Sequence, residues 1–393
     1  MHPFEFNYII FSIALLIILL IHKLGFKNQL VDYCFIGITF IVFVLLHVGV
    51  DINSVEDLPR YEQQFYDVSR VSIGNIFEQI RTSDYFYAIF NRIVSYFSKD
   101  FVFFLLVYNL VLFGSLYVVI KKYSPYPLIS VVLILLFVYN QSLFVVRQYL
   151  ALSIILLTIP SILQKKLPIY LMLCTVAFFT HSSAIVWVPV YFLYNIKKTR
   201  DLVIALVVAI FIISMLNSDL GRYLFLFGLD FSNYFDTTAE TSLNAKLIRI
   251  IYLVFYVLFL GKHSMDQGIN RLCLIILIIL TAGYVFAPPI EVVGRMLLYY
   301  QCFLIFAIPL TMSKIKSAII KMCYLIGILI FQGYLIMKGL EEFYFADYRY
   351  EGVPVLYMVI VFVAAAFMVW FYKRDTIDDK AYKGLRISFI NKR

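Results

Sequence analysis

Two arginines and one histidine stand inside long apolar stretches of the sequence. Arg147 opens the stretch RQYLALSIILL, His181 lies in FFTHSSAIVWVP, and Arg295 lies in GRMLLYYQCFLIFAIP. An ionisable group at membrane depth costs free energy, so each of these residues is a candidate for function. A guanidinium group binds phosphate through paired hydrogen bonds, and a neutral imidazole accepts a proton from a hydroxyl. The three residues therefore predict a reaction that moves a proton and stabilises a phosphate-like anion.

The composition places this chemistry in a membrane. Of the 393 residues, 63% are hydrophobic and only 15% are charged, which is too little polar surface for a soluble globule of this size. The net charge of +9 requires no nucleic acid, because lysine and arginine gather in the cytoplasmic loops of membrane proteins. We therefore expect an all-α protein, a polytopic bundle of membrane helices.

Hydropathy predicts thirteen membrane spans, each of them approaching the roughly 20 apolar residues that a helix needs to cross a bilayer. They are 7–22, 32–49, 100–120, 126–141, 143–163, 167–180, 182–196, 201–217, 245–261, 271–288, 294–312, 316–337 and 353–372. An N-terminus outside and a C-terminus inside place 21 of the 33 lysines and arginines on the cytoplasmic side. Basic residues then gather in every second connection between spans, and this regular alternation favours that orientation.

The long connections lie on the outer side in this topology. A single catalytic domain, 1–372, is expected to carry outward-facing loops at 50–99, 217–244 and 338–352, followed by a basic cytoplasmic tail, 373–393. In the first loop, Ser83 and Asp84 are candidate helix caps. Apolar residues follow at three- and four-residue spacing: Phe86, Ile89, Phe90, Ile93, Val94 and Phe97. They predict an amphipathic helix that lies in the membrane interface or packs on the bundle.

The run from Tyr126 to Leu163 is too long for one span, at about 57 Å. We expect a hairpin that turns at Tyr139-Asn140-Gln141-Ser142, with Arg147 about a turn inside the second helix. A cation there opposes the helix dipole, unless an anion binds between it and the helix N-terminus. Gln148, and Tyr139 and Asn140 of the turn, are then candidate substrate contacts. The alternative is that Arg147 extends to lipid headgroups.

The segment Leu167–Ile196 is short for two spans, so it predicts a hairpin with its tip below the outer surface. His181 and Ser182 lie at this tip, where an imidazole could act as a base. The alternative is a histidine hydrogen-bonded between helices. Arg295 starts a later span from the same side, with Tyr299 one turn further on, and a local ion pair with Glu291 is its alternative role.

These stretches resemble the EpsG-like branch of the Wzy-type bacterial polysaccharide polymerases. The matching features occur in order over roughly residues 45–310, with Gly49-x-Asp51 and Arg60-Tyr61 followed by RQYLALSIILL, HSSAIVWVP and GRMLLYYQCF. The resemblance implies an enzyme of the bacterial inner membrane with its active site facing the periplasm or exterior. It also makes Asp51, Arg60 and Tyr61 candidate substrate-binding residues.

The resemblance implies a substrate as well. Such enzymes join oligosaccharide repeat units carried on undecaprenyl pyrophosphate, working beside a flippase and a chain-length regulator. On this hypothesis Arg147 and Arg295 stabilise the leaving pyrophosphate, and His181 is the base for the acceptor hydroxyl. Two arginines can supply the charge that a metal supplies elsewhere, so we expect no metal and no cofactor.

Four other functions remain open from the sequence. An O-antigen ligase shares this chemistry with a different acceptor, and a polyprenyl-phosphate-sugar glycosyltransferase could use the acidic pair Glu56-Asp57. A transporter of lipid-linked saccharide is an alternative from a different class. A multi-pass acyltransferase would also use a catalytic histidine. The sequence has no Walker motif that would indicate nucleotide chemistry and no HExxH motif that would indicate zinc chemistry.

Overall fold

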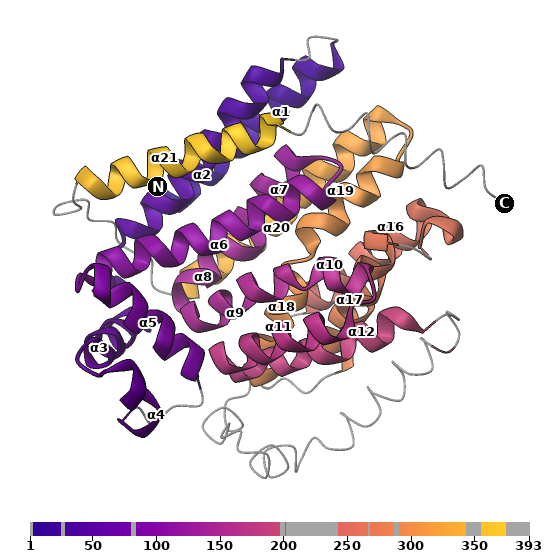
Figure 1. Cartoon of the computed structure of the whole chain (residues 1–393). Helices are drawn as coiled ribbons and strands as arrows, with labels where there is room; N and C mark the ends of the chain where they lie inside the picture. The colour runs from indigo at the N-terminus through magenta and orange to yellow at the C-terminus, as the bar shows by residue number, and fades with distance from the viewer. Residues whose placement is uncertain are drawn as a thin grey trace.

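Every regular element that the structure describes is a helix (Figure 1). This computed structural model describes residues 3–24, 28–79, 84–196, 201, 243–265, 268–286, 291–342 and 355–374. Helices satisfy all their backbone hydrogen bonds internally, as a chain this apolar requires within lipid. The expected all-α class is confirmed for these residues.

The chain begins with two long helices, which are followed by several short helices and a third long helix. Two helical segments with breaks, 127–144 and 146–163, come next. The elements up to residue 123 are α1 (Pro3–Lys23), α2 (Gln29–Val48), η1 (Ile52–Ser54), α3 (Leu58–Ser69), η2 (Ile73–Asn75), α4 (Ile76–Gln79), α5 (Tyr85–Phe97) and α6 (Phe101–Tyr123). From there to residue 195 they are α7 (Pro127–Ile134), η3 (Leu135–Tyr139), α8 (Asn140–Phe144), α9 (Val146–Leu157), α10 (Ile159–Leu163), α11 (Leu167–Thr180), η4 (Ser182–Trp187) and α12 (Val188–Asn195).

The second half contains α16 (Leu243–Met265), α17 (Gly268–Phe286), α18 (Glu291–Gln301), α19 (Leu304–Lys314), α20 (Ala318–Glu342) and α21 (Val355–Arg374). Five helical segments are long and apolar enough to cross a membrane, and α18 with α19, bent by 43°, would make a sixth. The protein is therefore a multi-pass membrane protein by length and composition. All but the first residue of the predicted span 201–217 lies outside the described residues, as does most of 217–244, 338–352 and 373–393.

The helices that matter for the site pack in a continuous row. Helix α21 runs beside α2, α2 packs on α6, α6 on α9, and α9 on α11 (Figure 1). Helix α5 packs on α3, α6 and α11, while η4 contacts both α11 and α18. This arrangement brings the beginnings of α5 and α9 to the end of α11.

The hairpin between α7 and α9 turns later than the sequence predicts. The polar cluster expected to form the turn is helical, running from the π-helical segment η3 into α8, and the chain leaves the helix only at Val145. The Ser142 hydroxyl donates to the Tyr139 carbonyl, at 2.7 Å, so this hydroxyl is satisfied inside the helix. The predicted turn is therefore wrong by a few residues, and Arg147 is the second residue of α9 rather than a full turn inside it.

The amphipathic helix of the first loop is present as α5. Its buried face carries Tyr87, Ala88, Asn91, Val94 and Ser95, while Phe86, Ile93 and Phe97 are exposed. Large apolar side chains on the exposed face are the pattern of a helix that also contacts lipid. Of the two predicted caps, Ser83 lies outside the described residues, and Asp84 precedes the helix but makes no side-chain cap hydrogen bond.

Candidate active site

One buried carboxylate lies between Arg147 and His181. The Arg147 Nη1 atom donates to Asp84 Oδ2 at 2.7 Å, and His181 Nδ1 lies 3.6 Å from the same oxygen. The Asp84 side chain is 6% exposed, whereas those of Arg147 and His181 are 21% and 20% exposed. The carboxylate is thus covered, and the two residues around it remain accessible.

Three helix ends hold this cluster in place. Asp84 directly precedes α5, Arg147 begins α9, and His181 is the last residue of the turn that ends α11. The His181 backbone N–H donates to the Ala177 carbonyl at 2.9 Å, and its own carbonyl accepts from Ala184 at 2.9 Å. The imidazole therefore sits on a backbone fixed on both sides, at the break between α11 and η4 where the sequence predicts the hairpin tip.

The geometry suits an imidazole that accepts a proton. A carboxylate facing Nδ1 favours the tautomer with the proton on that nitrogen, which leaves Nε2 as the acceptor. At 3.6 Å the two groups are just beyond hydrogen-bond distance, as is common before a substrate binds. Arg147 compensates the charge of Asp84, which would otherwise be costly to bury.

Tyr61 of α3 lies against the same arginine. The guanidinium carbon of Arg147 is 5.7 Å from the centre of the Tyr61 ring. Burial raises the pKa of the Tyr61 hydroxyl above its ordinary value, while the positive charges of Arg147 and Arg295 oppose this shift. The Tyr61 hydroxyl therefore stays protonated at neutral pH and can donate a hydrogen bond. The positive charges of both arginines influence its pKa.

Gln148 joins the Arg147 helix to the Arg295 helix. Its Nε2 atom donates to the backbone carbonyl of Arg295, and its side chain is almost fully buried. Its Oε1 atom has no hydrogen-bond partner among the described residues. The predicted residues Arg147, Gln148, His181, Arg295 and Tyr61 thus lie in one neighbourhood.

The predicted residue Tyr299 on α18 contacts a serine of η4. The Tyr299 hydroxyl is 3.2 Å from the hydroxyl of Ser183, and both are buried. Tyr300 donates to the Val186 carbonyl. These two contacts hold η4, which follows His181, against α18, which carries Arg295.

The remaining candidates have local roles in the structure. Asp51 caps η1, accepting from the Asn53 N–H at 3.2 Å, and Arg60 is exposed on α3. Tyr139 is buried against His47, with ring centres 4.4 Å apart, and Asn140 is partly buried at the start of α8. Glu291, the alternative partner of Arg295, has a side chain outside the described set.

Asp84 is the residue that sequence reasoning missed. An acid directly before an amphipathic helix has the pattern of a cap, and its partners are distant in the sequence. The available signal was indirect, since two basic groups at membrane depth require an acidic partner or an anionic ligand. Within the described ranges, no group of three or more His, Cys, Asp or Glu residues is placed to hold a metal ion.

A model of the EpsG family matches residues 34–350, which include Asp84 and every predicted site residue. The chain belongs to the EpsG family. The resemblance inferred from the motifs is therefore confirmed, and EpsG membership indicates a membrane protein of the polysaccharide polymerase type. Searches of curated proteins and of solved structures find no match.

Proposed function

We propose that this EpsG-family protein polymerises lipid-linked oligosaccharide repeat units. It transfers the growing glycan from undecaprenyl pyrophosphate to the non-reducing end of an incoming lipid-linked repeat unit. The observation that supports this proposal is the cluster of Asp84, Arg147 and His181, with Arg295 attached through Gln148. It combines a proton acceptor with a net positive charge at accessible helix ends.

The reaction uses one displacement at the donor's anomeric carbon. The acceptor hydroxyl oxygen forms the new glycosidic bond, and the bond from that carbon to the pyrophosphate breaks with its electron pair on the leaving oxygen. The hydroxyl proton passes to His181 Nε2. Asp84 acts through Nδ1 as a positioning residue, because it stabilises the imidazolium that forms.

The charges favour the leaving group. Arg147 and Arg295 bring two positive charges, and Asp84 brings one negative charge. Only one nitrogen of Arg147 is hydrogen-bonded to Asp84, and its Nε has no partner among the described residues. Arg147 also hydrogen-bonds the Tyr61 side chain, so the Nε is the donor left for a phosphate.

We further propose the setting of the reaction. Thirteen spans, with the N-terminus outside and the C-terminus inside, place the cluster on the periplasmic or outer face of the bacterial inner membrane, in a catalytic domain of residues 1–372. The partners are membrane lipid, a flippase and a chain-length regulator of the same pathway. The reaction requires no metal.

The test is chain extension by purified protein in lipid, with a synthetic lipid-linked repeat unit as substrate. We expect Arg147→Ala, His181→Ala and Arg295→Ala each to slow extension by about 10²-fold or more. Arg70→Ala, an exposed arginine after α3, is the matched control with unchanged extension. EDTA should leave the rate unchanged. Near-normal extension by all three site variants, with normal melting, would contradict the proposal.

The same assay separates the glycosyltransferase alternatives, and a deletion strain tests for a transporter. Transfer to a soluble or lipid A acceptor instead of a lipid-linked unit indicates a ligase. Metal dependence, with transfer from a polyprenyl-phosphate sugar, indicates the other glycosyltransferase class. Unchanged glycan length with blocked export in a deletion strain indicates a transporter.

A further inference from the structure

The chain passes from α8 to α9 through one residue that is not helical. Helix α8 ends at Phe144, Val145 has φ −122° and ψ 58°, and α9 begins at Val146. Residues 128–159 contain no glycine and no proline, the residues that usually end a helix. The local sequence therefore does not explain the break before Arg147, and a contact from another helix is needed to fix its position.

That contact is a hydrogen bond from α6 to the end of α8. A helix that ends leaves its last carbonyls without amide donors. The Ser142 carbonyl would accept from the Val146 N–H in an unbroken helix, but this bond requires helical angles at Val145. The Tyr108 hydroxyl donates to the Ser142 carbonyl instead, at 2.8 Å. It thus takes the place of the missing amide at the helix end.

Burial makes this hydrogen bond decisive. The side chains of Tyr108 and Ser142 are both 0% exposed, so water does not replace the hydroxyl. A buried carbonyl without a donor is costly. Without the hydroxyl, the less costly arrangement is for α8 to continue through Val145 and take up the Val146 N–H. The start of α9, and Arg147 with it, would then move.

The ring of Tyr108 belongs to an aromatic column that also reaches the Arg147 side chain. It stacks on Phe104, with ring centres 6.4 Å apart and planes at 7°. Phe104 contacts Tyr87 of α5 edge to face, and Tyr87 contacts Tyr61 of α3 in the same way, at 6.2 and 6.3 Å. Tyr61 lies against the Arg147 guanidinium, at 5.7 Å. One end of the column therefore holds the backbone before Arg147, and the other end holds its side chain.

We propose that Tyr108 is a positioning residue for Arg147, because its hydroxyl sets the residue at which α8 ends and so the point at which α9 begins. This inference rests on the proposed function, in which Arg147 stabilises the leaving pyrophosphate. Tyr108 touches no substrate in this proposal, and it acts only through the helix break.

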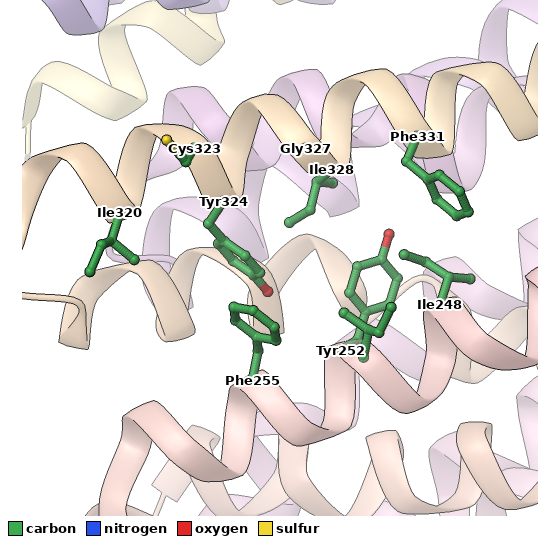
Figure 2. Close-up of a pocket in the computed structure, with 10 residues that line it drawn as sticks. Ile248, Tyr252, Phe255, Ile320, Cys323, Tyr324, Gly327, Ile328 and Phe331 are labelled. Carbon is green, nitrogen blue, oxygen red and sulfur yellow. The ribbon is translucent and has the colours of Figure 1, made fainter.

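Tyr256 on α16 provides the matched control. Its hydroxyl donates to the Asn270 carbonyl at 2.8 Å, and it is as buried as Tyr108. Asn270 lies in the first turn of α17, where a carbonyl also accepts from its own helix, so this bond completes no helix end. Tyr256 comes four residues after Tyr252, which lines an apolar groove between α16 and α20 (Figure 2). Helix α16 carries none of the candidate active-site residues.

Chain extension by the purified full-length protein in lipid compares the two tyrosines. A displaced Arg147 no longer faces the charge that develops in the transition state. We therefore expect Tyr108→Phe to lower kcat by about tenfold or more, with a smaller change in KM. Tyr256→Phe should keep the parent rate. Equal rates in the two variants would overturn the proposal.

A proline at position 146 tests the helix break from the other side. Proline is favoured at the first position of a helix and keeps the preceding residue out of the helical region. Val146→Pro therefore stops α8 from continuing through Val145. Added to Tyr108→Phe, it should restore kcat to within about threefold of the parent, although the Ser142 carbonyl stays unpaired and the melting temperature stays low. A double variant as slow as Tyr108→Phe would overturn the proposal, because proline does not repair a loss caused by the unpaired carbonyl alone.

The single proline variant keeps the test decisive if Tyr108→Phe does not fold. Because α9 begins at Val146, proline there removes no hydrogen bond within that helix. Val146→Pro alone should extend glycan at a rate within about twofold of the parent. A folded Val146→Pro protein that is about tenfold slower would overturn the proposal, since the break would then not be the arrangement that places Arg147.

Melting separates this inference from the proposed function. A cycle of Asp84→Asn and Arg147→Gln measures the coupling within the ion pair and requires no turnover. In the Tyr108→Phe background this coupling should be lost, and it should return when Val146→Pro is added. A coupling that stays unchanged in Tyr108→Phe would overturn the proposal. A coupling that is lost as expected, in a protein whose parent extends no glycan, would contradict the proposed function and not the positioning of Arg147 by Tyr108.

Discussion

Asp84 and Arg147, 63 residues apart in the sequence, form an ion pair with 2.7 Å between Oδ2 and Nη1. The pair fixes the beginning of α5, in the first long loop, to the beginning of α9, a helix of the central bundle. Because His181 faces the same carboxylate oxygen, one acid positions both a cation and an imidazole. Changes at Asp84 should therefore affect stability and chemistry together.

Asp84→Asn tests this double role. The amide keeps the shape and one acceptor but removes the charge, so we expect melting at lower temperature, with a loss of about 1–3 kcal/mol. Chain extension should fall further than this loss explains, mainly in kcat, because the imidazolium loses its counter-charge. Differential scanning fluorimetry and the extension assay measure the two effects.

A cycle with Arg147 separates the contributions. Asp84→Asn combined with Arg147→Gln should be less destabilised than the two single changes added together, because the second change removes a charge that the first leaves unpaired. Asp57→Asn, a half-buried acid at the start of α3, is the control. Additive losses would mean that the pair contributes no coupling.

The pH dependence of extension tests His181 as the proton acceptor. A protonated imidazole accepts no proton, so the rate of the unchanged protein should fall as the pH is lowered. In His181→Gln the residual rate should be low and should lose this dependence. Burial raises the pKa of the Tyr61 hydroxyl above the ordinary tyrosine value of about 10. The hydroxyl therefore stays protonated over the alkaline side of the profile. Tyr61→Phe should therefore leave the alkaline side of the profile unchanged.

The sequence was sufficient for the fold class and for most of the helix ends, because long apolar runs and their flanking charges are local signals. The tip at His181 is such a case, since α11 ends at Thr180. Asp84 could not be found in this way, because its partners belong to α9 and α11 and only the packing of α5 brings them together.

Neighbouring serines at the tip give a stability test. Ser183→Ala removes the buried contact with Tyr299 and should cost about 1 kcal/mol, while Ser182→Ala should have little effect on melting. The comparison of the two variants checks the register of η4. Equal melting of both variants would show that the Ser183 contact does not form.

Two glycines near Arg295 differ in what surrounds them. A Cβ at Gly283 on α17 would lie 2.5 Å from a methyl carbon of Leu297, so Gly283→Ala should destabilise the protein by about 1–3 kcal/mol.

A Cβ at Gly294 meets nothing within 4 Å, although this glycine lies inside α18 and directly precedes Arg295. Alanine there should raise helix stability by up to about 1 kcal/mol. Packing therefore does not require Gly294, whereas close approach of a bound substrate would. We expect Gly294→Ala to melt at the same or a higher temperature and to show a raised KM for the lipid-linked donor. An unchanged KM would mean that the substrate does not approach this face of α18.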